Sequence, residues 1–151
     1  MIFNPKPRFY LFYYINMNLN FSISELIRSQ NAINAGIDNT PSIKETDNLL
    51  NLIFYILQPL RDKFGAIKVT SGFRNQKVNF LAGGAINSNH LYGCAADIIP
   101  QNATFKQLYD YVVQNLDYDE CFIEKSSSAK WLHVAYRKGN NRKKHNPNYI
   151  V

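Results

Sequence analysis

The sequence predicts an α+β domain, in which helices pack against a small, mainly antiparallel sheet. Two observations lead to this prediction. Serine or threonine caps precede apolar residues with helical spacing, and short strand-like runs bounded by glycine or proline lie between these segments. The order along the chain is helices, strand, strand, helix and a final pair of strands, which is typical of helices packed on one face of a sheet. A length of 151 residues is the usual size of one such domain.

The helices are predicted from their caps. The stretch SISE at 22–25 is a capping box, so a first helix should begin there and end at Gly36. PSIKE at 41–45 begins a second helix, which Pro59 is expected to end or kink. Its apolar residues fall on one face: Leu49, Leu50, Ile53, Ile56, Leu57 and Leu60. A third helix is expected over 104–116.

The strands are predicted from short runs rich in β-branched and aromatic residues. They are AIKVT (66–70), AADII (95–99), ECFIE (120–124) and KWLHVAY (130–136). Between the first two, NQKVNFL reads as one or two helical turns. The last two runs are joined by a serine-rich loop and should form an antiparallel hairpin.

The charge of the chain favours an anionic partner. The net charge is +6 and the isoelectric point is near 9.3, which suits nucleic acid, an acidic membrane surface or an anionic cell-wall polymer. Basic residues crowd the C-terminal tail, 138–151, without a recognisable nucleic-acid motif. We predict that this tail is mainly solvated, with adhesion to an anionic surface as the alternative. Specific nucleic-acid binding is not expected.

The two ends of the chain flank one predicted domain at 17–137. Residues 1–16 form an N-terminal extension of uncertain role, and they lack the cleavage site and smooth apolar region of a secretion signal. No apolar run reaches the roughly 18 residues that would span a membrane. Cys94 and Cys121 form no CxxC pair, so a disulfide scaffold is not expected and a reducing compartment suits them.

Two histidines and one aspartate are candidates for a metal site. His90 lies in a loop that opens a strand, Asp97 lies in that strand, and His133 lies in another. Catalytic zinc takes three protein ligands of the histidine or carboxylate type, so these three residues would be a complete set. The alternative is a surface histidine and an ordinary aspartate at the end of a strand. His145, in the basic tail, is expected to be solvated.

The pattern around His90 favours the metal site. The stretch SNHLYGCAADII at 88–99 contains H-x-x-G-x-A-x-D. If residues 93–97 are extended, Ala95 and Asp97 share one face, while Cys94 falls on the other as a packing residue. A methyl-sized neighbour leaves space beside Asp97, and Gly93 permits the backbone to bend His90 toward the same ion.

These motifs resemble those of the zinc D-Ala-D-Ala carboxypeptidases and phage endolysin peptidases, which share a fold with the Hedgehog signalling domain. The resemblance extends from about residue 20 to 136 and includes SGFR at 71–74, S-x-H-x-x-G-x-A-x-D at 88–97 and W-x-H at 131–133, in family order. It implies one Zn²⁺ held by His90, Asp97 and His133. It also implies a peptidase that acts on bacterial peptidoglycan peptides, either as a D,D-carboxypeptidase or as an endolysin-type endopeptidase.

The catalytic carboxylate departs from the common family pattern. A carboxylate must take a proton from the attacking water and pass it to the leaving amine. Many relatives carry this acid three positions before the last histidine, where this chain has Lys130. Glu124 and Glu120 are the two replacements. A four-residue hairpin loop would place Glu124 on the face of His133, and a five-residue loop would place it on the opposite face.

Three more residues are candidates for substrate binding. The planar guanidinium of Arg74 suits a peptide carboxylate or a developing oxyanion, with a structural salt bridge as the alternative. Ser88 is expected to hydrogen-bond its loop and is no candidate nucleophile, and Tyr92 is a candidate for lining the cleft. We expect a monomer without membrane contact, which stays in the cytoplasm until it is released to the cell wall. The alternative function is a non-catalytic, Hedgehog-like zinc-binding interaction domain.

Overall fold

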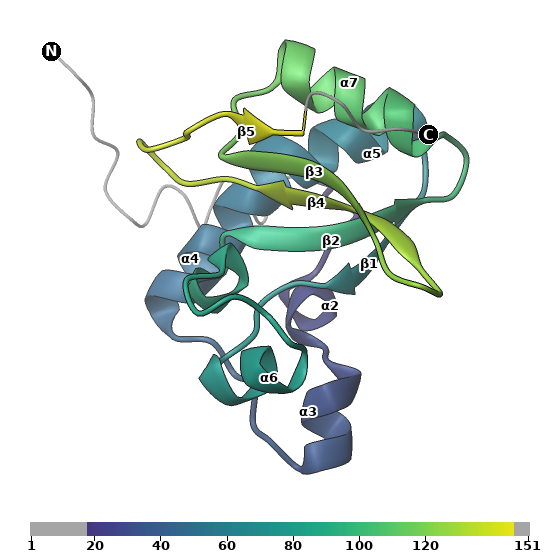
Figure 1. Ribbon diagram of the computed structural model, residues 1–151. Coiled ribbons are helices and arrows are strands. Elements are labelled where there is room, and N and C mark those ends of the chain that lie inside the picture. Colours follow the sequence, from purple (N-terminus) through teal and green to yellow (C-terminus); the bar gives the residue numbers. More distant parts are fainter. Residues whose placement is uncertain (1–17, 147–151) are drawn as a thin grey trace, which may run out of the picture.

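The computed structural model describes residues 18–146 and confirms the α+β prediction (Figure 1). Five strands form one sheet in the order β1-β2-β4-β3-β5, and all neighbours are antiparallel except the pair β3 and β5. The strands are β1 (Ile67–Ser71), β2 (Ala95–Pro100), β3 (Glu120–Lys125), β4 (Lys130–Ala135) and β5 (Lys144–His145). The predicted extension at 1–16 lies outside the described residues.

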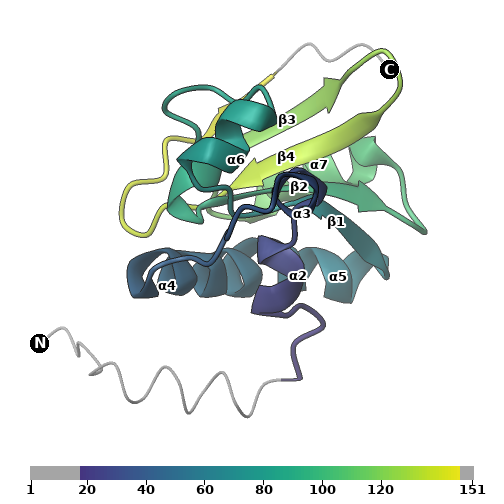
Figure 2. The same cartoon turned by 90° about the horizontal axis from the view of Figure 1, so that it is seen from below.

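The longest helical segments cover one face of this sheet, and α6 lies on the other side (Figure 2). The helical elements are α2 (Ile23–Ile27), α3 (Gln30–Ala35), α4 (Ile43–Leu52), η1 (Ile53–Leu57), α5 (Gln58–Phe64), α6 (Gln76–Leu81), η2 (Asn89–Tyr92) and α7 (Phe105–Asn115). Within residues 18–146, no helix has the length and apolarity needed to cross a membrane.

The first predicted helix is interrupted. Ser22 caps α2 as expected, but Arg28 and Ser29 are extended, and the Ser29 side chain accepts a hydrogen bond from the backbone N–H of Ala32 to start α3. Serine competes well for this role because its hydroxyl satisfies a free amide at a helix start. Gly36 ends α3 in the left-handed conformation, as predicted.

The second predicted helix continues past Pro59 as α4, η1 and α5. The middle segment is one wider π-helical turn, in which the N–H of Gln58 bonds to the carbonyl of Ile53, five residues earlier. Proline lacks an N–H and clashes with the carbonyl four residues before it in a regular α-helix. The wider turn accommodates Pro59 without ending the helix.

The hydrophobic core lies between the sheet and these helices. The predicted apolar face of the second helix supplies much of it, with Leu49, Ile53, Ile56, Leu57 and Leu60 buried. Leu132 and Val134 of β4 point into the same core. Because side chains alternate along a strand, their neighbours Trp131 and His133 point to the opposite face of the sheet.

The register of the final hairpin is set by a four-residue loop. Glu124 pairs with Trp131 and Lys125 with Lys130, so residues 126–129 form the loop. Directly paired residues share a face of the sheet. Glu124 therefore lies on the same face as His133, the first of the two registers considered above.

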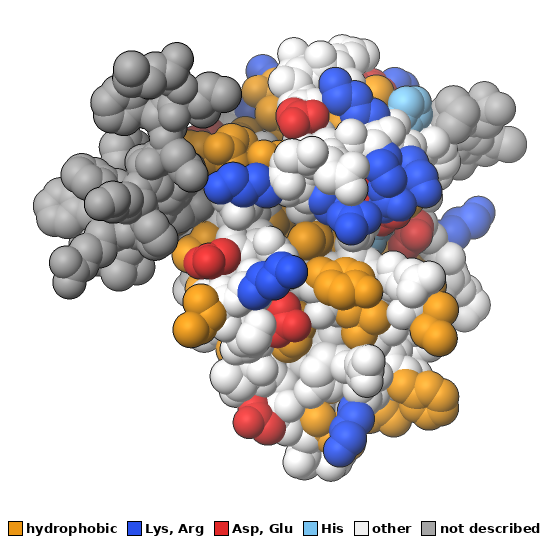
Figure 3. Space-filling model, turned by 90° about the vertical axis from the view of Figure 1, so that its left-hand side faces the viewer, with side chains coloured by type: hydrophobic (Ala, Val, Ile, Leu, Met, Phe, Trp, Pro, Cys, Tyr) orange, Lys and Arg blue, Asp and Glu red, His pale blue; other side chains and the backbone are white. Residues whose placement is uncertain are grey.

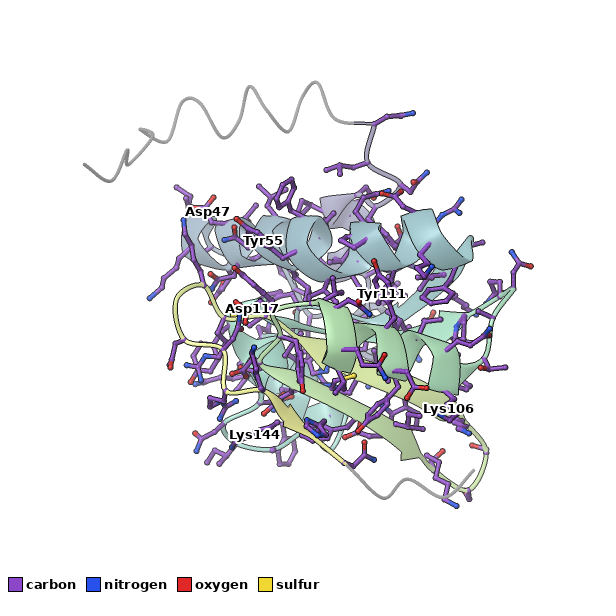
Figure 4. All side chains as sticks on the ribbon, turned by 90° about the horizontal axis from the view of Figure 1, so that it is seen from above. Asp47, Tyr55, Lys106, Tyr111, Asp117 and Lys144 are labelled. Atoms are coloured by element: carbon purple, nitrogen blue, oxygen red, sulfur yellow. The ribbon has the colours of Figure 1, made fainter. Side chains whose placement is uncertain are left out.

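Most residues of the C-terminal segment 137–146 are exposed, yet the segment also contacts the sheet, which the sequence did not predict. Strand β5 pairs with β3, and the hydroxyl of Tyr118 hydrogen-bonds His145 Nδ1 at 2.7 Å. Asn141 donates to Asp117, which is labelled beside this segment in Figure 4. Lysine and arginine side chains gather on the face shown in Figure 3, and Lys138, Arg142, Lys143 and Lys144 are exposed.

Candidate metal centre and active site

His90, Asp97 and His133 meet on the face of the sheet opposite the core. His90 comes from η2, Asp97 from β2 and His133 from β4, where Asp97 and His133 are cross-strand partners. One potential ligand atom from each residue lies within 4.8 Å of the other two. The three predicted ligands therefore form one cluster, although His90 and His133 are 43 residues apart in the sequence.

The orientation of the two imidazole rings suits a cation. His90 Nδ1 lies 2.7 Å from the carbonyl oxygen of Gly72, and His133 Nε2 lies 3.0 Å from Glu120 Oε2. Each acceptor holds a proton on the ring nitrogen beside it, which leaves the other nitrogen of a neutral ring with a lone pair. These nitrogens, His90 Nε2 and His133 Nδ1, lie 3.3 and 3.0 Å from the same oxygen, Asp97 Oδ1.

The spacing and chemistry of these atoms fit a zinc ion. Tetrahedral zinc binds histidine nitrogen and carboxylate oxygen at about 2.0–2.2 Å, so its ligand atoms stand about 3.3 Å apart. A lone pair of His90 facing the carboxylate of Asp97 is repulsive unless a positive charge lies between them. These ligand atoms are therefore suited to binding a shared cation rather than to contacting one another directly.

Charge is shared unevenly among the three residues. Burial lowers the pKa of His90, which keeps that ring neutral. Burial also opposes the charge on His133, but hydrogen bonds to Asp97 and Glu120 outweigh it and raise its pKa to about 9. Burial opposes the charge on Asp97 as well, but its carboxylate accepts a hydrogen bond from His133 Nδ1 and lies close to His90, and its pKa is held well below the usual range. A metal ion would have to displace the His133 proton that faces Asp97.

Two glycines permit the backbone approaches that shape this centre. A Cβ at Gly72 would stand 2.1 Å from the carbonyl oxygen of Leu26, so only glycine brings its own carbonyl to His90. Gly93 is left-handed with φ of 69°, and a Cβ there would stand 2.4 Å from the carbonyl oxygen of Glu45. Gly93 ends η2 and turns the chain into β2, which carries Asp97.

Both candidate catalytic glutamates face this centre, but their partners differ. Glu120 accepts from His133 at Oε2 and from Arg142 at Oε1. Glu124 accepts from the indole N–H of Trp131 at 2.8 Å through Oε2, and its side chain is more exposed. Glu120 is thus held by its neighbours, whereas Glu124 has a carboxylate oxygen available.

A cavity of about 360 Å³ lies over the cluster. Its walls include the predicted metal ligands, both glutamates, Arg74, Ser88, Phe122, Trp131 and the loop residues 82–85. The Nε atom of Arg74 is buried without a hydrogen-bond partner, and no carboxylate among residues 18–146 lies within ion-pair distance of its guanidinium. Burial lowers its pKa, although the charges of Asp97 and Glu124 oppose this effect. The structural salt bridge considered for Arg74 is absent from the described residues.

The remaining predicted site residues lie in different positions. Ser88 lines the cavity and its hydroxyl accepts from the backbone N–H of His90 at 3.3 Å, which matches a role in holding the loop. Tyr92 is half exposed and does not line the cavity, so the structure does not place it beside the ligands. Lys130 lies on the opposite face of β4, with its ammonium 5.1 Å from the ring centre of Phe105.

Several residues at the site had no signal in the sequence. The ring of Phe122 stacks on His133, with centroids 6.0 Å apart. Asn89, Asp119 and Arg142 form a polar cluster with Glu120 behind the histidine. Asn89 and Asp119 adjoin predicted site residues, but Arg142 lies in a basic run that reads as a solvated tail. Their contacts depend on pairings between distant segments.

Comparison with known families agrees with this geometry. The family model described as Peptidase M15 matches residues 19–135, which include all three predicted ligands, both glutamates and Arg74. No curated protein matches the chain. Members of this family are metal-dependent peptidases. With most of its length matched and a His-Asp-His cluster in place, the chain belongs to the Peptidase M15 family.

Proposed function

We propose that this protein is a zinc-dependent peptidase that hydrolyses peptidoglycan peptides, in the stem or in the cross-link. The family supports a metallopeptidase with a peptide substrate. One observation carries the proposal furthest: His90 Nε2 and His133 Nδ1 converge on a single oxygen of Asp97. The cavity above them is also lined by the Glu124 carboxylate and by Arg74, whose Nε has no hydrogen-bond partner among residues 18–146.

His90, Asp97 and His133 would hold the zinc ion. Bound zinc supplies a water of lowered pKa and polarises the scissile carbonyl. The protein's own part is to keep both rings in the correct tautomer. The Gly72 carbonyl does so for His90, and the Glu120 carboxylate does so for His133.

Glu124 is the residue that we assign to proton transfer. Its Oε2 is fixed by the Trp131 indole, and its side chain lines the cavity on the same face as His133. The carboxylate would take a proton from the attacking water and give it to the leaving amine. Glu120 is less suited to this task, because hydrogen bonds from His133 and Asn89 stabilise its charged form and lower its pKa.

Arg74 is the residue that we assign to the substrate. Its guanidinium would pair with a peptide carboxylate or with the oxygen of the scissile carbonyl. The first contact suits a carboxypeptidase, which needs a free C-terminus. The second suits an endopeptidase.

The physiological setting that we propose is a phage-type lysin that acts as a monomer after release to the cell wall. The net charge of +6 suits an anionic wall. The proposal for this setting follows from the family resemblance and the charge.

Digestion of defined muropeptides, followed by mass spectrometry, tests the proposal. Zinc-loaded protein should remove a terminal D-alanine from a stem peptide or split a cross-linked dimer, and the products name the bond. Glu124→Gln should retain zinc and lose about 10²–10⁴-fold in rate. Glu25→Gln, which changes an exposed glutamate on α2, is the control and should behave like the parent.

The alternative function predicts a different result. If zinc-loaded parent cleaves no muropeptide and Glu124→Gln is indistinguishable from it, the peptidase proposal fails. A non-catalytic, Hedgehog-like zinc domain would then explain the metal centre.

A further inference from the structure

A polar cluster lies directly behind His133 and reaches the C-terminal segment. It consists of Asn89, Asp119, Glu120 and Arg142. Arg142 donates to Asp119 through Nε at 2.8 Å and through Nη2 at 2.6 Å, and Nη2 also donates to Glu120 Oε1 at 2.9 Å. The Asn89 amide donates to Asp119 Oδ2 at 2.8 Å and to Glu120 Oε2 at 2.9 Å.

Asp119 is the anchor of this cluster. Its side chain is fully buried, and the Arg142 backbone N–H adds a third hydrogen bond from the same residue at 3.1 Å. A buried carboxylate needs such partners. The fork of a guanidinium fixes direction as well as charge, so the position of Arg142 is closely defined.

This arrangement holds Glu120 from both sides. Arg142 binds one carboxylate oxygen of Glu120, and Asn89 binds the other. That second oxygen, Oε2, also accepts from His133 Nε2 at 3.0 Å. Glu120 therefore cannot turn away from His133 without losing a hydrogen bond to Arg142, Asn89 or both.

Two of the predicted ligands are coupled to the cluster. His133 contacts Glu120 directly, and Asn89 immediately precedes His90 in η2. A carboxylate on the remote nitrogen of a ligating histidine fixes its ring and increases its basicity. The residues that hold Glu120, Arg142 and Asn89, therefore also influence the orientation and basicity of His133 Nδ1, the ring nitrogen that faces Asp97.

We propose that Arg142 is a positioning residue of the metal centre, which acts through Glu120 to present His133 Nδ1 to the metal. The C-terminal segment would then be part of the active centre, although residue 142 lies beyond the matched residues 19–135. This inference rests on the proposed metal site. It is separate from the proposed reaction, because it concerns metal binding alone.

Zinc affinity, measured by competition with a chromophoric chelator, tests this role. Glu120→Ala should weaken zinc binding about 10- to 100-fold, the usual effect of losing such an outer partner. Arg142→Ala should weaken it in the same direction. In the Glu120→Ala background, Arg142→Ala should cause little further loss, since its effect passes through Glu120. The visible spectrum of the Co²⁺-loaded protein should change in both single variants, because it reports ligand geometry.

Two further variants separate positioning from general stability. Lys144→Ala removes the same charge from the same segment, and its exposed side chain makes no ion pair among residues 18–146, so its zinc affinity should equal that of the parent. Lys144 is labelled at the edge of the structure in Figure 4. Arg142→Lys keeps a positive charge beside the Asp119 carboxylate, but lysine lacks the guanidinium fork that also reaches Glu120. It should fold and still bind zinc more weakly, which keeps the test valid if Arg142→Ala does not fold.

The outcomes distinguish this inference from the proposed function. If folded Arg142→Lys and Arg142→Ala bind zinc as the parent does and only melt at a lower temperature, Arg142 is merely structural and the inference is overturned. A parent that binds zinc but cleaves no muropeptide contradicts the proposed reaction and leaves this inference standing. A parent that binds no zinc overturns both.

Discussion

Arg74 has an unpaired hydrogen-bond donor in the cavity over the His-Asp-His cluster. Its Nε atom is buried and has no hydrogen-bond partner within the described range 18–146, while its backbone N–H is bonded to the carbonyl of His90. The backbone is thus tied to the metal centre and the side chain is left for another group. An anion that fills this place would recover a charge-assisted hydrogen bond.

We predict that Arg74→Lys lowers kcat/KM about 10- to 100-fold, because a hydrogen bond to a charged group contributes about 1.5–3 kcal/mol. Lysine keeps the charge but not the planar fork. Steady-state kinetics on the muropeptide that the digestion experiment shows to be cleaved would measure the effect. Zinc affinity is the control and should stay unchanged; unchanged kinetics would contradict the assignment of Arg74 to the substrate.

Gly72 is a second position that shapes the site, because its carbonyl oxygen contacts His90 and the lack of a Cβ permits this approach. We predict that Gly72→Ala destabilises the protein by about 1–3 kcal/mol, as overpacking does, because its Cβ would overlap the Leu26 carbonyl. It should also weaken zinc binding, since the Gly72 carbonyl orients His90. Urea unfolding and zinc titration would measure the two effects.

Gly139→Ala is the matched control for this change. Gly139 is left-handed, with φ of 75°, and a Cβ there meets nothing within 4 Å. The substitution should cost about 1 kcal/mol from the backbone alone and leave zinc binding intact. Equal zinc affinity in both variants would rule out the role of the Gly72 carbonyl.

The long helix formed by α4, η1 and α5 connects local sequence signals with the core. Its capping box is complete: the Ser42 hydroxyl accepts from the Glu45 N–H, and the Glu45 carboxylate accepts from the Ser42 N–H. Such boxes are recognised from sequence because both partners lie within one turn. Pro59 indicates a disturbance of this helix locally, but it does not by itself tell whether the helix ends, kinks or continues through a wider turn.

We predict that Ser42→Ala lowers the free energy of unfolding by about 1 kcal/mol, the usual cost of losing such a cap. Activity should stay at the parent level, because the change lies on the helix side of the molecule. Urea unfolding would measure the loss. Ser127→Ala in the exposed hairpin loop should change stability by less than about 0.5 kcal/mol, and an equal loss there would mean that the cap contributes nothing.

The C-terminal segment gives the whole molecule a predicted dependence on pH. Burial alone would raise the pKa of Asp119, but hydrogen bonds from Arg142 and Asn89 outweigh it and hold the pKa below the usual value. A carboxyl with a depressed folded pKa adds stability that is complete above its unfolded pKa of about 3.9 and is lost as the pH falls through the folded value.

We therefore predict that Asp119→Asn is less stable than the parent by about 1–3 kcal/mol at pH 7, and that the difference shrinks below about pH 4. Urea unfolding of the metal-free protein from pH 3 to pH 7 would measure it. A difference that stays constant over this range would show that the charge of Asp119 does not stabilise the fold.

Metal binding should stabilise the whole fold, because the ligands come from three separate elements. We predict that zinc at 100 times its dissociation constant adds about 2.7 kcal/mol to the free energy of unfolding. A chelator should remove this gain, and His133→Ala should not show it. Thermal melts with and without zinc would test both statements; a parent melt that does not respond to zinc would contradict the proposed metal site.

The sequence alone predicted much of the fold and the centre of the site. The caps at Ser42 and Thr104 involve residues within one helical turn, and the side-chain alternation around Asp97 lies within one strand. Such features can therefore be predicted from a short stretch of sequence. The types and spacing of His90, Asp97 and His133 were sufficient to propose them as ligands. The structure then brought the three together.

Tertiary structure alone decided which carboxylates face the His-Asp-His cluster. Side chains change face with every residue of a strand, so one residue more in the hairpin loop would have moved Glu120 and Glu124 away from His133. The contact of Arg142 with Asp119 joins segments 23 residues apart in a chain region that reads as a solvated tail. Such contacts arise from the pairing of distant segments, and for that reason they are not encoded in any short stretch of sequence.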